Sequence, residues 1–346
     1  MIGPEAPSAA APTSARTVLR IPTADGWRIG LTRLPAVRRR HHAVILCHGL
    51  AANHAVFELG GNASLASRLS AAGWDVWMLD LRGHGESDMP RLFGERRYGW
   101  CFDDYLRKDL PAAIGHVRAE TGASVHWIGH SMGGILLYGH LALGGSDGVR
   151  SGVTIGSSLD YSASASQFHQ LRRLRFLTRL VPAIPFRLLC RTLAPLAGRT
   201  SNPIERFLYW PGNMEGRLVR KLLGDGFHAI SAPVLAQMAS AFEPGGLRSA
   251  DGTMRYIDGL AAATTPVLAL AGDRDRQCPP DAAARTLDAL GASEKRLAPF
   301  GPPHGHALSY GHFDLLNGRM AGEDVHPHVE SWLEAHDRSA SEGVSD

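Results

Sequence analysis

Short apolar runs ending in glycine or a polar residue recur along the chain, and segments with helical spacing separate most of them. Residues 17–34 alternate around Ala24-Asp25-Gly26, which predicts an opening hairpin. Later apolar runs predict buried strands at 43–49, 74–80, 124–129, 152–158, 266–272 and 295–300. Helical patterns cover 64–72, 103–121, 132–143 and 281–290, and a last helix is expected to end near Trp332. Strands that are apolar throughout and alternate with helices predict an α/β fold, with a mostly parallel sheet covered by helices on both faces.

One long segment, residues 160–263, has helical periodicity without a strong strand. It begins and ends beside predicted sheet strands, so we interpret it as an insertion that forms a helical cap. The predicted organisation is therefore a core made of 17–159 and 264–336, the cap at 160–263, and flexible tails at 1–16 and 337–346.

Composition supports a folded globular protein and narrows its partners. The 346 residues are 44% hydrophobic and 20% charged, and the formal net charge of +3 is too mild to favour nucleic acid. The four cysteines form no CxxC pair, which favours free thiols in a reducing compartment. We find neither a secretion signal nor an apolar run long enough to span a membrane, so we expect a cytoplasmic protein. The sequence does not indicate the oligomeric state.

The most informative motif is Gly129-His130-Ser131-Met132-Gly133, which lies between a predicted strand and a predicted helix. A G-x-S-x-G motif in that position is typical of a nucleophile elbow, a tight turn that presents a serine beyond the sheet. The Met132 amide at the helix N-terminus is then expected to donate to an oxyanion. The alternative is an ordinary tight turn in which the serine only caps the helix.

A catalytic serine needs a general base and an acid that orients it. In this architecture the acid follows a later strand, and PVLALAGDRD offers Asp273 and Asp275, of which we prefer Asp275 because it is placed to face the serine. The base is expected on a loop after the last strand, where we prefer His312 to its two competitors, His304 and His306. His130 is a poor candidate despite its adjacency, since neighbours in so sharp a turn point in different directions.

A second oxyanion donor and the walls of the cleft can also be assigned. Gly49 lets the backbone turn after the first central strand, so the Leu50 amide is expected to face the serine oxygen. Phe57 and Trp100 are predicted to line the substrate site. The closely spaced histidines near the C-terminus have no carboxylate or cysteine partners at ligand spacing, so we predict no metal site and no cofactor.

Together these motifs resemble the α/β-hydrolase superfamily, through HGL (48–50), DLRGHGESD (80–88), GHSMGG (129–134), GDRD (272–275) and YGHFDLL (310–316). The resemblance implies an eight-stranded sheet and a Ser-His-Asp triad. Asn62 with the following SLASRL, and then FDDYLRKDLPAAI, is similar to the acid lipase branch. The chain departs from that branch in its elbow, GHSMG rather than GHSQG. A serine at the elbow also differs from relatives that use an aspartate nucleophile. Within DLRGHGESD, Arg82 and His84 are expected to brace the loop.

The cap has an unusual charge pattern. Between 161 and 204 it has seven arginines and no Asp, Glu or Lys, interleaved with apolar residues; the arginines are Arg172, Arg173, Arg175, Arg179, Arg187, Arg191 and Arg199. This basic amphipathic stretch predicts an apolar cleft beneath it, with attraction to anionic lipid or an acyl carrier as the alternative role. We therefore expect a small-molecule ester or lipid substrate with an apolar acyl chain, and peripheral membrane contact through the cap. A peptidase, a C–C hydrolase, an acyltransferase and a non-catalytic lipid-binding protein remain alternatives.

Overall fold

The computed structural model describes residues 15–36, 38–91, 94–171, 180–199 and 202–337. Its centre is an eight-stranded sheet in the order β1-β2-β4-β3-β5-β6-β9-β10. The first hairpin pairs antiparallel with itself and with β4, and the other neighbours are parallel. The strands are β1 (Thr17–Pro22), β2 (Arg28–Leu34), β3 (Val44–Cys47), β4 (Val76–Asp80), β5 (Val125–His130), β6 (Val149–Ile155), β9 (Val267–Gly272) and β10 (Lys295–Phe300).

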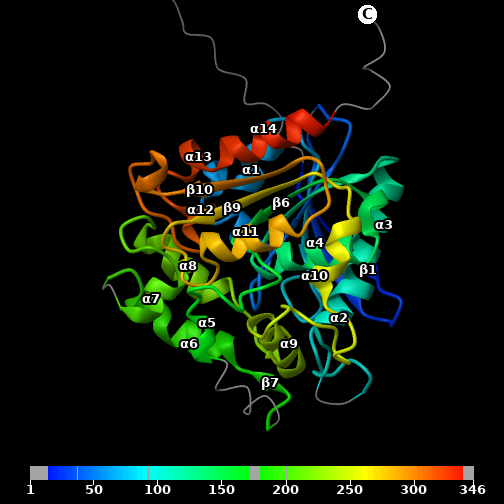
Figure 1. Cartoon of the computed structure of the whole chain (residues 1–346), viewed down its shortest axis with the longest axis horizontal. Helices are drawn as coiled ribbons and strands as arrows, with labels where there is room; N and C mark the ends of the chain where they lie inside the picture. Colours follow the sequence, from blue (N-terminus) through cyan, green and yellow to red (C-terminus); the bar gives the residue numbers. More distant parts are fainter. Residues whose placement is uncertain (1–14, 37, 92–93, 172–179, 200–201, 338–346) are drawn as a thin grey trace, which may run out of the picture.

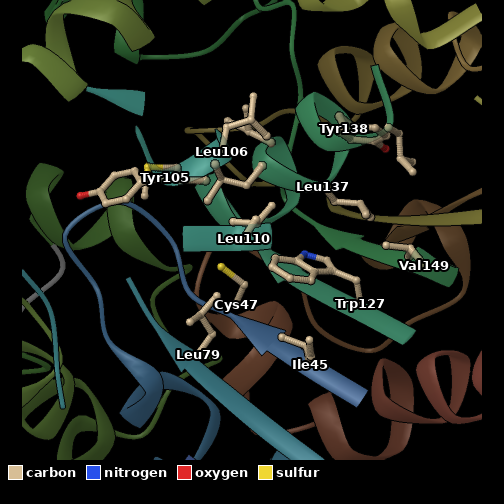
Figure 2. Close-up of a cluster of buried hydrophobic side chains, with 14 of the residues drawn as sticks. Ile45, Cys47, Leu79, Tyr105, Leu106, Leu110, Trp127, Leu137, Tyr138 and Val149 are labelled. Carbon is tan, nitrogen blue, oxygen red and sulfur yellow. The ribbon is translucent and has the colours of Figure 1, made fainter. Parts of the chain in front are cut away.

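Successive side chains of the central strands enter two different cores, as the alternation of a strand requires. On β3, Ile45 and Cys47 belong to one cluster, whereas Val44 and Leu46 belong to the other. Figure 2 shows part of the first cluster, in which Trp127 of β5 lies among side chains from the strands and the helices above them. The sheet is buried on both faces, which is why its strands are apolar throughout.

Helices cover each face. On one side lie α3 (Leu110–Thr121), α4 (Met132–Ala142) and α11 (Pro280–Asp288), and on the other α1 (Leu65–Ala71) and α14 (His326–His336), which run side by side in Figure 1. Arg68 of α1 bonds Glu330 of α14 through two N–H groups, at 2.9 and 3.2 Å. The remaining short helices of the core are α2 (Phe102–Asp104), α12 (Asp314–Asn317) and α13 (Ala321–Asp324).

Most of the segment between β6 and β9 gathers beside one edge of the sheet, drawn in green to olive in Figure 1, and its last helix, in yellow, packs on α4. Its helices are α5 (Phe168–Leu171), α6 (Phe186–Leu193), α7 (Pro203–Leu208), α8 (Gly216–Asp225), α9 (Ala232–Met238) and α10 (Tyr256–Gly259). A short antiparallel pair, β7 (Ala183–Ile184) with β8 (Ile230–Ser231), joins two distant parts of it. The boundaries of the cap at 160 and 263 stay a prediction.

Most predicted elements are confirmed within a few residues, with three differences. β6 begins at Val149, earlier than predicted, and the helix predicted over 103–121 contains a π-helical turn at Tyr105–Asp109. The last helix continues to His336, because Trp332 and His336 are both buried on the same face one turn apart. Nearly all of both predicted tails, and the four arginines between 172 and 179, lie outside the described residues.

Candidate active site

Ser131 occupies a strained turn between β5 and α4. Its φ of 53° and ψ of −119° lie where non-glycine residues are rare. The turn also brings backbone so close that its glycines cannot be replaced: a Cβ on Gly133 would lie 2.1 Å from the Cys47 carbonyl oxygen, and one on Gly129 would lie 2.3 Å from the backbone of Gly133. The Ser157 hydroxyl donates to the Ser131 carbonyl at 2.8 Å and supports the turn from the next strand.

The two predicted oxyanion donors lie beside Ser131. β3 and β5 are parallel neighbours with Cys47 opposite Gly129, so both strands end at the same edge of the sheet. A Cβ on Gly49 would come within 2.8 Å of the Ser131 Cβ, which places the backbone entering Leu50 against the serine. Met132 is the first residue of α4, where backbone N–H groups have no partner within the helix. The structure therefore brings Leu50, Met132 and Ser131 together.

Asp275 and His312 form a buried pair. The His312 Nδ1–H donates to Asp275 Oδ2 at 2.7 Å, and His312 is 2% exposed. The other Asp275 oxygen accepts from the backbone N–H groups of Gln277 and Cys278, at 2.8 and 2.9 Å, which holds the carboxylate in place. With its proton on Nδ1, His312 keeps a lone pair on Nε2, and this buried atom has no hydrogen-bond partner among the described residues.

Gly156 brings this pair to the strand end next to the serine. It follows β6 with φ 61°, and a Cβ on it would lie 2.9 Å from Asp275 Oδ2 and 3.0 Å from His312 Nδ1. The Ser131 N–H bonds the Ile155 carbonyl one residue earlier, at 2.8 Å. The described contacts include no hydrogen bond between Ser131 and His312. All three side chains nevertheless gather at the carboxyl edge of the sheet.

The alternative candidates for the acid and the base, Asp273, His304 and His306, have other surroundings. Asp273 accepts from the Ser309 hydroxyl at 3.0 Å and the Tyr310 N–H at 2.8 Å, so it braces the loop that leads to His312. His306 interacts with the backbone of Gly301, and His304 ends an exposed 3-10 turn.

His130 bonds the backbone of the loop that carries His312. Its Nε2–H donates to the His312 carbonyl at 3.1 Å. Burial holds the pKa of this imidazole well below its usual range, so it stays neutral. Neutral and bonded in this way, His130 positions the loop that carries His312.

A second buried polar cluster holds the loops below Leu50. Asp80 accepts from the His54 N–H at 2.8 Å, from His54 Nδ1 at 2.6 Å and from the Glu86 N–H at 2.9 Å. Burial alone would raise the pKa of Asp80, but the hydrogen bond and charge of His54 outweigh it and bring it to about 2. Burial lowers the pKa of His48 to about 3, and its neutral ring donates from Nδ1 to the Gly49 carbonyl at 2.8 Å. Within DLRGHGESD, Arg82 bonds Asp25 and Asp109, and His84 Nδ1 donates to the Arg82 carbonyl at 2.9 Å, so both side chains brace this loop as predicted.

The predicted lining residues lie apart from each other. Phe57 is 1% exposed in the core cluster that contains α1 and α14. Trp100 is 5% exposed in the other cluster, where its Nε1–H donates to the Tyr105 hydroxyl. The structure does not bring these two side chains together, and their role in binding substrate stays a prediction.

Aromatic contacts and a backbone hydrogen bond that join the cap to the site could not be predicted from the sequence. The Phe227 ring packs against Phe313, next to His312, with centroids 5.7 Å apart, and Phe186 of α6 packs on Phe227 at 5.2 Å. The His228 N–H donates to the Ala51 carbonyl at 2.6 Å. Nothing local in the sequence marks these cap residues, because their partners are more than 80 positions away for Phe313 and more than 170 for Ala51.

The sheet order, together with a serine elbow that opens α4 and a histidine–aspartate pair beyond β9 and β10, defines the α/β-hydrolase fold. No group of three or more potential metal ligands lies together in the described ranges. No helix within those ranges is long and apolar enough to cross a bilayer.

Comparison with known proteins agrees with this fold. Residues 38–208 match the family model described as serine aminopeptidase, S33. Human lysosomal acid lipase/cholesteryl ester hydrolase is 32% identical over 124 residues, which make up 33% of this chain and 31% of the lipase. Triacylglycerol lipase 2 of Arabidopsis thaliana is 27% identical over 126 residues, 33% of this chain and 30% of that protein. The match thus spans about a third of the length of these curated relatives.

Solved structures cover much more of the chain. A soluble variant of the monoglyceride lipase of Saccharomyces cerevisiae has a TM-score of 0.64 at 16% identity, over 96% of this chain and 100% of the other. The monoacylglycerol lipase of Paleococcus ferrophilus has a TM-score of 0.60 at 21% identity, over 88% and 99%. The chain is an α/β-hydrolase, with partial sequence similarity to the acid lipases.

Proposed function

We propose that this protein is a serine hydrolase that cleaves carboxylic esters with an apolar acyl chain. The observation that carries the proposal is the buried Asp275–His312 pair, whose free Nε2 lies at the sheet edge where the strained turn presents Ser131. A base oriented by a buried carboxylate beside a serine elbow is the arrangement that acyl transfer requires.

In the proposed mechanism His312 Nε2 takes the proton of Ser131 as the serine oxygen attacks the ester carbonyl. The backbone amides of Leu50 and Met132 stabilise the oxyanion, and Asp275 stabilises the imidazolium that forms. His312 then protonates the leaving alcohol. Water, deprotonated by the same histidine, releases the acyl group from Ser131. The steps use no cofactor.

The same residues would also serve a peptidase, a C–C hydrolase or an acyltransferase, and the matching family model is described as an aminopeptidase. The apolar surroundings favour esters: Phe313 packs on the His312 ring, Phe227 packs on Phe313, and Phe186 of the cap packs on Phe227. A series of p-nitrophenyl esters of increasing acyl length, set against aminoacyl anilides, separates these activities. We expect higher kcat/KM for medium acyl chains and no turnover of the anilides.

A fluorophosphonate probe tests the nucleophile directly. We expect it to label the wild-type protein and to fail on Ser131→Ala, whereas the exposed Ser293→Ala variant labels normally. Absence of labelling in folded wild-type protein would favour a non-catalytic lipid-binding protein on this fold.

We also propose that the cap contacts membrane surfaces. Six of the ten exposed large hydrophobic side chains among the described residues lie between 180 and 204: Leu180, Val181, Leu188, Leu189, Leu196 and Ile204. Arginines stand among them at 187, 191 and 199. Apolar side chains next to arginines suit an anionic bilayer surface. Binding to vesicles containing phosphatidylserine should weaken from 50 to 500 mM salt, and salt-independent binding or none would contradict it. A cytoplasmic location stays a prediction.

A further inference from the structure

A groove of about 450 Å³ lies between α6 of the cap and the loops that follow β4. Its lining includes Arg187, Leu188 and Arg191 from α6, Met89 and Tyr98 from the facing loops, and His228. None of its lining residues is acidic. The groove is therefore a concave surface with positive charge on one wall and apolar side chains around it.

Arg187 and Arg191 are both exposed. Arg187 and Arg191 are one helical turn apart, so they project from the same side of α6. Neither has an ion-pair partner in the part of the chain that the structure describes. Two guanidinium groups at this spacing present several N–H donors in planes that suit phosphate or carboxylate oxygens.

His228 adds a neutral donor. It is 8% exposed, and its Nε2 accepts from the Gly85 N–H at 3.2 Å and from the Asn53 side-chain amide at 3.1 Å. Because Nε2 accepts, the ring proton is on Nδ1, which has no hydrogen-bond partner among the described residues. Burial, with the charges of His84 and Arg187, lowers the pKa of His228 to about 3, so the ring stays neutral. His228 thus lines the groove with a neutral ring whose Nδ1–H has no described acceptor, beside the two arginines and the Tyr98 side chain.

One lining residue, His228, links the groove to the loop that carries Leu50. The His228 N–H bonds the Ala51 carbonyl at 2.6 Å, and Ala51 follows the predicted oxyanion donor Leu50. Met89 and Leu188 are 41% and 65% exposed at the walls and offer apolar contact to the alkyl part of a ligand.

We propose that this groove binds the phosphate group of an anionic amphiphile, and that the preferred ester substrate has such a group at one end. The substrate preference rests on the proposed ester hydrolysis, whereas the binding site does not. Charge selects the phosphate, through Arg187, Arg191 and the Nδ1–H of His228, and the apolar wall selects an alkyl chain over a free anion.

Calorimetric titration of the full-length Ser131→Ala protein with octyl phosphate tests the site without turnover. We expect saturable binding at one site, weakened at least tenfold in Arg187→Ala/Arg191→Ala. The matched control, Arg217→Ala/Lys221→Ala on α8, removes two exposed cap charges away from the groove and should bind within twofold of the parent. Octyl glucoside and inorganic phosphate should each bind at least tenfold more weakly than octyl phosphate.

Absence of saturable binding, equal binding of octyl glucoside, or equal weakening in the control pair would overturn the proposal. Inorganic phosphate binding as tightly as octyl phosphate would overturn the amphiphile and leave a free-anion site. If the wild-type protein cleaves esters but does not bind octyl phosphate, the proposed phosphate site is refuted and the proposed ester hydrolysis stands. If it binds octyl phosphate but cleaves no ester, the ester hydrolysis is refuted and the phosphate site stands.

Discussion

Replacement of Arg82 by methionine should be among the most destabilising single changes outside the candidate active site. The guanidinium is 1% exposed and donates to Asp109 through Nε at 2.9 Å and Nη2 at 2.6 Å, and to Asp25 at 2.7 and 3.0 Å. Arg82→Met keeps most of the apolar stem but leaves Asp109, which is fully buried, with only the Arg82 backbone N–H as a donor. Breaking a buried pair by removing one partner costs about 3–5 kcal/mol. That is a large part of the ~5–15 kcal/mol that stabilises a typical domain.

Urea unfolding followed by circular dichroism at pH 7.5 measures this loss. Arg28→Met is the matched control, because the Arg28 side chain is 54% exposed and pairs with Asp88 at 3.5 Å. We expect that control to lose less than about 1 kcal/mol. A second variant, Arg82→Met with Asp109→Asn, removes the stranded charge and keeps an acceptor for the Arg82 N–H, so it should recover about 2 kcal/mol. A loss below about 1 kcal/mol in Arg82→Met, or a double variant less stable than the single one, would refute the assignment of a buried charge pair.

Three further predictions concern the elbow, the acid and the pH dependence of stability. Gly133→Ala should abolish fluorophosphonate labelling, since its Cβ would lie 2.1 Å from a backbone oxygen. The control Gly115→Ala, with open space around it, should label normally and be more stable by about 0.5–1 kcal/mol. Normal labelling of Gly133→Ala would contradict the turn geometry. Asp275→Asn should slow labelling by about 10⁴-fold at an unchanged melting temperature, and Asp273→Asn should slow it far less; equal effects would reverse the assignment. The free energy of unfolding should decrease as the pH falls from 7 to 5. Burial lowers the pKa values of four histidines to about 3 or 4 in the folded state, so the unfolded chain binds protons at a higher pH than the folded one. These histidines are His48, His126, His228 and His326. Each histidine contributes up to about 1.4 kcal/mol per pH unit below pH 6.5. Asp314 and Asp109, whose pKa values burial raises to about 7 and about 6, oppose this by gaining stability as they protonate. We therefore expect a net loss of about 4 kcal/mol by urea titration, and an unchanged midpoint would exclude it.

The sheet could be predicted because most of its strands are short apolar runs that end at a glycine or a polar residue. Gly129 and Gly133 are part of the elbow motif seen in the sequence, and a Cβ on either would clash with neighbouring backbone atoms. The choice between Asp273 and Asp275 was harder, since both follow β9 within three residues. Only the fold shows that Asp273 bonds the Tyr310 N–H while Asp275 bonds the His312 ring.

The cap contacts could not be predicted, because they depend on pairings between distant segments that no local pattern encodes. Arg187 and Arg191 were visible as part of a basic amphipathic stretch, yet nothing in that stretch placed them opposite Met89 and Tyr98. His228 had no distinguishing neighbours at all. Its importance comes from three other segments, at Ala51, Asn53 and Gly85, that converge on it in space.

The bond from the His228 N–H to the Ala51 carbonyl has a consequence for protein engineering. Exchanging the whole cap for that of a homologue would be one way to change substrate specificity. Here such a graft over 160–263 would also remove a backbone donor that holds the turn at Ala51, a non-glycine residue at φ 62°. A chimera that retains Gly226–Ala229 and exchanges only α5 to α8 should keep its turnover number, whereas one that replaces those four residues by a loop of different path should lose rate before it loses substrate affinity.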